Sequence, residues 1–87
     1  MTQEQIENKL AKNPGNPFFE IHFKARNPVN GFFITTRDTG ELSFKNLWRI
    51  VSESALDEFK KTGNENLSRI FNGTDFTRMD ILPIKNK

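Results

Sequence analysis

Hydrophobic and polar residues alternate along several short segments, a pattern typical of half-buried β-strands. The clearest segment is 18–25, whose odd positions are apolar: Phe19, Ile21, Phe23 and Ala25. Further strands are predicted over 32–37, 42–51 and both halves of 66–79. Because the side chains of a strand alternate between its two faces, the apolar set of each segment is expected to face one shared core.

Two Asn-Gly pairs lie at the expected turns between these segments, Asn30-Gly31 and Asn72-Gly73. Asn-Gly is the dipeptide that best tolerates the positive φ angles of a two-residue hairpin turn. The first pair therefore predicts a return of the chain into the strand at 32–37, and the second predicts an antiparallel hairpin over 66–79. The alternative for 64–73 is a helix capped by Asn64 and ended by Gly73.

The segment 42–51 has two interpretations. As a strand, it places Leu42, Phe44, Trp48 and Ile50 on one face, with Asn46 marking a bulge or bend. As part of one long helix over 44–60, it also fits apolar spacings of three and four. We favour the strand because Trp and Ile are β-formers, and we expect Trp48 in the core.

A short helix is predicted over 3–12. Thr2 and Gln5 have the spacing of a capping box, and Asn13-Pro14-Gly15 ends the helix. Ile6 and Leu10 lie on one face, so the helix is expected to dock on the strands through them.

A second short helix is predicted over 55–62. Ser54 is its expected N-cap, acidic residues begin it, Lys60 and Lys61 end it, and Gly63 follows. This order of charges is the one that the helix dipole favours. Leu56 and Phe59 are expected to face the core.

The fold class predicted from these elements is α+β and rich in β-structure. The chain is expected to be one domain over 1–87, with a helix and linker at 1–15, a β-rich core at 16–82 and a frayed tail at 83–87. Five short antiparallel strands can close into a small barrel of the SH3-like or Sm-like kind, with one helix at the N-terminus and one before the last hairpin.

Composition excludes several classes of site. The chain has no Cys, so it has no disulfide and no thiol nucleophile, which favours the cytoplasm as its location. No apolar run near Met1 is long enough for a signal peptide or membrane span, so no membrane partner is expected. His22 is the one histidine, and a lone His lacks partners for a triad or a metal site. We therefore expect neither an enzyme nor a metal or other cofactor.

The formal net charge is +2, with the basic excess on the predicted strands. Five arginines lie on or beside these strands, each within a few residues of a Phe or Trp: Arg26, Arg37, Arg49, Arg69 and Arg78. Guanidinium groups bind phosphate and aromatic rings stack on unpaired bases, so this set is the candidate nucleic-acid surface. The hairpin would place Arg69 and Arg78 on one face. The competing interpretation is a solvated face whose aliphatic stems cover the rings.

Two rings break the strand parity, Phe18 and Phe32, and are candidates for binding a partner. They must be covered by the N-terminal helix over 3–12, by another protein or second copy, or by nucleic acid. The leading functional hypothesis is a non-enzymatic binding module, an accessory or regulatory factor on nucleic acid. The alternative is a protein–protein adaptor or homo-oligomer that uses an exposed Phe face.

Overall fold

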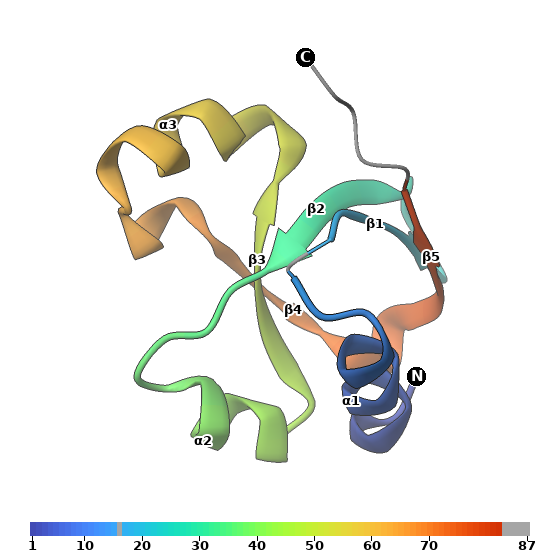
Figure 1. The fold of residues 1–87 in the computed structure, drawn as a ribbon. Coiled ribbons are helices and arrows are strands. Elements are labelled where there is room, and N and C mark those ends of the chain that lie inside the picture. The colour runs from blue at the N-terminus through green and yellow to red at the C-terminus, as the bar shows by residue number, and fades with distance from the viewer. Residues whose placement is uncertain (16, 83–87) are drawn as a thin grey trace.

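The computed structural model describes residues 1–15 and 17–82 as one antiparallel sheet with three helices (Figure 1). The helices are α1 (Gln3–Lys12), α2 (Thr39–Phe44) and α3 (Leu56–Thr62), and the strands are β1 (Phe19–Phe23), β2 (Val29–Phe33), β3 (Leu47–Ser52), β4 (Arg69–Asn72) and β5 (Phe76–Ile81). The predicted α+β class and its five antiparallel strands are confirmed. The tail predicted at 83–87 lies outside the described residues.

The strand order is β4-β3-β2-β1-β5, so β4 and β5 are the two edges of the sheet. Three residues, Gly73–Asp75, join these edges. The edges of a flat five-stranded sheet would lie about 19 Å apart, at about 4.8 Å per strand. The four residue steps from Asn72 to Phe76 span at most about 14 Å. The sheet must therefore curl, but β4 and β5 share no ladder and the described sheet is not closed into a barrel.

The predicted hairpin over 66–79 is wrong. β4 pairs with β3, and β5 pairs with β1. Among the described residues, positive φ occurs at Gly15, Asn46 and Gly63, and not at Gly73. A Cβ at Gly73 would lie 2.3 Å from Asn46 Oδ1, so this glycine permits a close approach instead of a turn. The helix considered for 64–73 is also wrong, because only Glu65–Leu67 forms a short 3-10 helix before β4 begins.

The turn predicted at Asn30-Gly31 is wrong for a related reason. Both residues lie inside β2, opposite Glu20 and Phe19 of β1. A Cβ at Gly31 would lie 2.6 Å from the carbonyl oxygen of Val51 on β3. The glycine therefore lets the backbones of β2 and β3 approach, and the strand predicted at 32–37 begins earlier, at Val29.

The strand predicted over 42–51 begins only at Leu47. Helix α2 precedes it, and Asn46 in the left-handed conformation separates the two elements. Phe44 ends α2 with 84% of its surface exposed, so its predicted place in the core is wrong. Trp48 and Ile50 are buried, as the alternation predicted. The alternative of one helix over 44–60 is wrong, since β3 occupies its centre.

The predicted capping box and apolar face of α1 are both confirmed. Thr2 and Gln5 form the capping box, and Ile6 is fully buried with Leu10 packed beside it. The helix over 55–62 is also confirmed as α3, and Gly63 ends it in the left-handed conformation. Its predicted cap is wrong: Ala55 holds the N-cap position, and no side chain caps this end.

Apolar side chains pack on both faces of the curled sheet. The larger cluster includes Ile6, Phe19, Phe33, Trp48, Ile50, Phe76 and Met79. On the other face, Phe32 packs against Phe18 and against Phe59 of α3, with ring centroids 5.3 and 5.7 Å apart. The cover expected from the N-terminal helix is thus supplied to Phe32 by α3 instead, and Phe32 is only 8% exposed.

A hydrogen-bonded hub at Asn46 fixes the N-terminus beside β5. The Asn46 side chain accepts from Trp48 Nε1 at 2.8 Å and donates to the Met1 carbonyl at 2.9 Å. The Met1 ammonium in turn donates to the carbonyl oxygens of Gly73 and Phe76, at 2.8 and 2.7 Å. These contacts anchor the start of α1 at the link between β4 and β5.

Of the helices that the structure describes, none has the length and apolarity needed to span a membrane.

Candidate binding groove and side-chain clusters

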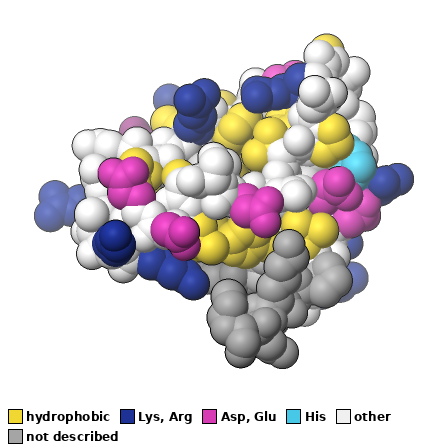
Figure 2. All heavy atoms as spheres, turned by 90° about the horizontal axis from the view of Figure 1, so that it is seen from above, with side chains coloured by type: hydrophobic (Ala, Val, Ile, Leu, Met, Phe, Trp, Pro, Cys, Tyr) yellow, Lys and Arg dark blue, Asp and Glu magenta, His cyan; other side chains and the backbone are white. Residues whose placement is uncertain are grey.

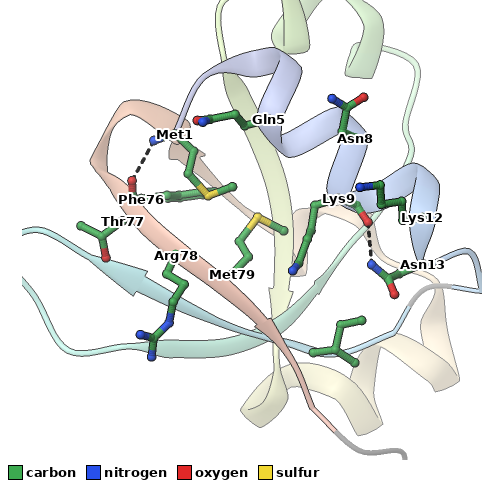
Figure 3. Close-up of a pocket in the computed structure, with 11 residues that line it drawn as sticks. Met1, Gln5, Asn8, Lys9, Lys12, Asn13, Phe76, Thr77, Arg78 and Met79 are labelled. Atoms are coloured by element: carbon green, nitrogen blue, oxygen red, sulfur yellow. Dashed lines mark hydrogen bonds between the residues drawn. The ribbon is translucent and has the colours of Figure 1, made fainter.

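An open groove of about 710 Å³ separates α1 from β5 (Figure 3). Met79 and Phe76 form part of its floor and are buried, whereas Ile81 at one end is 45% exposed. The wall on the α1 side carries amide side chains, among them Asn8 and Asn13. Asn13 Nδ2 donates to the carbonyl of Lys9 at 2.8 Å, which fixes the last turn of α1. The groove is therefore polar on the helix side and mixed along the strand, where Thr77 and Arg78 line it beside apolar side chains.

All the charged side chains that line the groove, among the described residues, are basic: Lys9, Lys12 and Arg78. Figure 3 shows Lys9 and Lys12 projecting from α1, while Arg78 projects from the other side of β5 and forms the rim. Strand β5 has β1 on one side, and the described residues provide no ladder on its other side. The groove thus combines basic side chains with a free strand edge.

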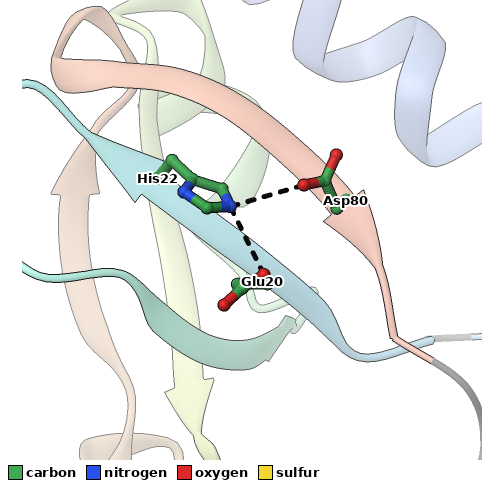
Figure 4. Close-up of side chains that lie close together, drawn as sticks. All are labelled: Glu20, His22 and Asp80. Carbon is green, nitrogen blue, oxygen red and sulfur yellow. Dashed lines mark ion pairs between the residues drawn. The ribbon is translucent and has the colours of Figure 1, made fainter.

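A second cluster lies on the outer face of the β1–β5 pair (Figure 4). His22 Nε2 lies 3.4 Å from Glu20 Oε1 and 3.3 Å from Asp80 Oδ2. Arg78 Nε donates to the same Asp80 oxygen at 2.8 Å, and its Nη2 lies 3.3 Å from His22 Nε2. Imidazole and carboxylate groups are ligands for divalent metals, so these three side chains could hold one. His22 lies on the polar face, as predicted. Contrary to the prediction, it has two neighbouring carboxylates, Glu20 and Asp80, that could share a metal ion with it.

Arg49 does not present a free guanidinium. Its Nε and Nη2 donate to the two carboxylate oxygens of Asp38, at 3.0 and 2.7 Å. These hydrogen bonds, followed by one from the Thr36 hydroxyl, hold the pKa of Asp38 well below its usual range. The same pairing raises the pKa of Arg49. Arg49 therefore ties the segment before α2 to β3.

The other predicted arginines lie apart. Arg26 stacks over the rings of Phe23 and Phe71, with its Cζ 5.2 and 5.5 Å from their centroids. Arg37 is exposed ahead of α2. Arg69 lies on edge strand β4 opposite Ile50, whereas Arg78 lies on edge strand β5 opposite His22. The predicted common face for Arg69 and Arg78 is wrong, because it depended on the hairpin.

The face seen in Figure 2 shows hydrophobic side chains exposed between acidic and basic ones, with the histidine among acidic neighbours. Among the described residues, the exposed large hydrophobic side chains are Phe44, Ile70 and Ile81. Ile70 and Ile81 lie on the two edge strands, and each is 45% exposed. By contrast, the predicted partner-binding residue Phe18 is half-buried against Phe32.

Sequence reasoning missed Lys9 and Lys12 as site residues. A signal was present, because the two lysines are three residues apart and so share one side of the predicted helix. It also missed the pairing of Glu20 with Asp80, for which the sequence offers no local signal.

Comparisons with protein-family models, curated proteins and solved structures found no match to this chain.

Proposed function

We propose that this protein is a non-enzymatic binding module that holds single-stranded nucleic acid in the groove between α1 and β5. The observation that carries the proposal is the charge of this groove, whose described charged lining residues are all basic. Lys9 and Lys12 would bind phosphates, and the exposed Ile81 would contact a base face, while Arg78 on the rim stays bonded to Asp80.

The shape of the groove favours a single strand over a duplex. Direct reading of a duplex in its major groove requires a protruding helix or β-ribbon. A concave groove bordered by basic side chains instead suits a backbone that runs along it with its bases turned inward. The partner would thus be an extended strand of DNA or RNA, and the protein an accessory factor on it.

We also propose that the curled sheet is a small SH3-like or Sm-like barrel left open between β4 and β5. Support comes from the four-strand meander and from the three-residue link that returns the chain to β1. An open seam would leave the β5 edge accessible from the groove. The cytoplasm is the proposed location on the basis of the Cys-free sequence alone.

The test is a titration of a labelled single-stranded oligonucleotide and its duplex at several salt concentrations. The double variant Lys9→Gln and Lys12→Gln should bind more weakly, and its salt slope should fall by about 1.4 units, at about 0.7 for each lost phosphate contact to a single strand. Arg69→Ala, on edge strand β4 and outside the groove lining, should leave binding unchanged.

A matched control is available on α3. Lys60 and Lys61, like Lys9 and Lys12, lie in the last turn of a helix, and both are exposed outside the groove. Lys60→Gln with Lys61→Gln removes the same charge with the same effect on a helix dipole. Equal losses in the two double variants, or no binding by the folded protein at low salt, would refute the groove as a nucleic-acid site.

One observation favours a second candidate function, that of a protein adaptor or homo-oligomer. The edge strands β4 and β5 each expose an isoleucine, and free edges can pair with another chain. The Phe face predicted for this role has less support, because Phe32 is buried against Phe59. Sedimentation at high salt would distinguish this candidate, since a mass that rises with protein concentration would indicate self-association.

A further inference from the structure

The outer face of the β1–β5 pair brings a histidine and two carboxylates together. We propose that Glu20, His22 and Asp80 form a binding site for one divalent transition-metal ion, with zinc as its probe. This site is separate from the groove and does not depend on the proposed nucleic-acid function.

The strand register points to a cation at this place. Glu20 lies directly opposite Asp80 in the antiparallel ladder, and like charges in that position destabilise a sheet. Arg78 bonds to Asp80 and offsets one of the two negative charges. Glu20, Asp80 and Arg78 together still carry one net negative charge. A bound divalent cation would remove the repulsion that remains.

The distances suit a tetrahedral metal better than direct hydrogen bonds. Zinc binds imidazole nitrogen and carboxylate oxygen at about 2.0 to 2.1 Å, so two of its ligands in a tetrahedron lie about 3.3 to 3.4 Å apart. His22 Nε2 lies 3.4 Å from Glu20 Oε1 and 3.3 Å from Asp80 Oδ2. A hydrogen bond from a charged imidazole to a carboxylate would measure about 2.7 to 2.9 Å. All three ligand atoms also lie within 4.8 Å of one another.

The site can be reached and filled without rebuilding the sheet. The side chains of Glu20, His22 and Asp80 are 39%, 24% and 43% exposed. Three protein ligands would leave a fourth position for water, and Nε2 ligation would put the imidazole proton on Nδ1. Arg78 must give up Asp80 Oδ2 and move from Nε2, which its 65% exposure allows. The metal and Arg78 therefore compete for the same two atoms.

The experiment is calorimetric titration of the chelator-treated 87-residue chain with zinc, repeated with cobalt to obtain the absorption spectrum of a tetrahedral site. We expect one ion per chain. His22→Ala, Glu20→Gln and Asp80→Asn should each weaken binding by about tenfold or more, whereas Asp57→Asn on α3 should change it little. Arg78→Gln should tighten binding, because it removes the competing cation.

Each outcome decides the proposal. The absence of one-to-one zinc binding at millimolar concentration, with folding intact by circular dichroism, would show a surface ion-pair network only. Zinc binding that survives His22→Ala would assign the ion to another place and overturn the site. An Arg78→Gln variant with unchanged or weaker affinity would refute the competition at Asp80.

Discussion

Substitution of Gly73 by alanine tests the packing that holds the N-terminus, β3 and the β4–β5 link together. A Cβ at this position would lie 2.3 Å from Asn46 Oδ1 and 2.6 Å from Ile6 Cδ1. Gly73 is not at positive φ, so alanine would bring no backbone strain, and its effect would come from the collision alone.

The expected loss can be estimated from two terms. Overpacking of this kind costs about 1 to 3 kcal/mol. Displacement of the Asn46 amide would also leave the Trp48 Nε1 donor, now bonded at 2.8 Å, without its acceptor, which costs about 1 to 3 kcal/mol more. We therefore expect Gly73→Ala to lower the free energy of unfolding by about 2 to 6 kcal/mol, which is a large share of the stability of a small domain.

The assay is chemical denaturation followed by fluorescence of Trp48, the one tryptophan of the chain. Gly40→Ala is the control, because a Cβ at Gly40 in α2 meets nothing within 4 Å and alanine favours a helix by up to about 1 kcal/mol. In an Asn46→Gly background, which tolerates the left-handed φ, Gly73→Ala should lower the free energy of unfolding by less, because only the collision with Ile6 Cδ1 remains. A Gly73→Ala protein as stable as the wild type, or equally destabilised in both backgrounds, would refute the described contact.

Two further predictions concern stability. Trp48→Ala should lower the free energy of unfolding by about 3 to 5 kcal/mol because Trp48 is buried, whereas Phe44→Ala should change it by no more than about 0.5 kcal/mol because Phe44 is exposed. Denaturation curves would measure both changes. Similar losses in the two variants would contradict the described placement of α2. Asp38 has a depressed pKa in the folded state, so its stabilising effect is present above the unfolded value of about 3.9 and is lost as the pH falls through the folded value. Asp38→Asn should therefore lower the melting temperature at neutral pH and reduce its fall below about pH 4. If the melting temperatures of the variant and the wild type changed in parallel with pH, the result would contradict the ion pair.

Local patterns predicted the elements whose signals are complete within one segment. The capping box of α1 and the left-handed Gly63 after α3 depend only on neighbouring residues, and both are present. The burial of Trp48 and Ile50 followed from strand parity. Leu42 and Phe44 fitted the same parity, but they belong to α2, because short apolar spacings suit a strand and a helix equally.

The two Asn-Gly pairs misled for a physical reason. Glycine is needed where φ is positive, but it is also needed where another backbone or side chain comes within the space of a Cβ. Gly31 and Gly73 are needed for close approach and not for a positive φ, and only the tertiary structure distinguishes these two requirements. Once the hairpin was assumed, β5 was placed beside β4 instead of β1.

Because the predicted hairpin misplaced β5, the sequence analysis could not predict the groove or the cluster of Glu20, His22 and Asp80. The groove joins α1 to β5, and the metal cluster joins Glu20 and His22 on β1 to Asp80 on β5. Both depend on contacts between the first third of the chain and β5. The sequence contained the residue types, but no local signal specified this pairing.

Chemical-shift mapping of the isotopically labelled protein with a short single-stranded oligonucleotide at low salt tests the central claim most directly. Binding in the groove predicts that the largest amide shifts fall on two segments, from Asn8 to Asn13 on α1 and from Thr77 to Ile81 on β5, and that added salt reverses them. Shifts concentrated on β4 or α3, or an unchanged spectrum at a saturating ligand concentration, would contradict the claim that this groove binds nucleic acid.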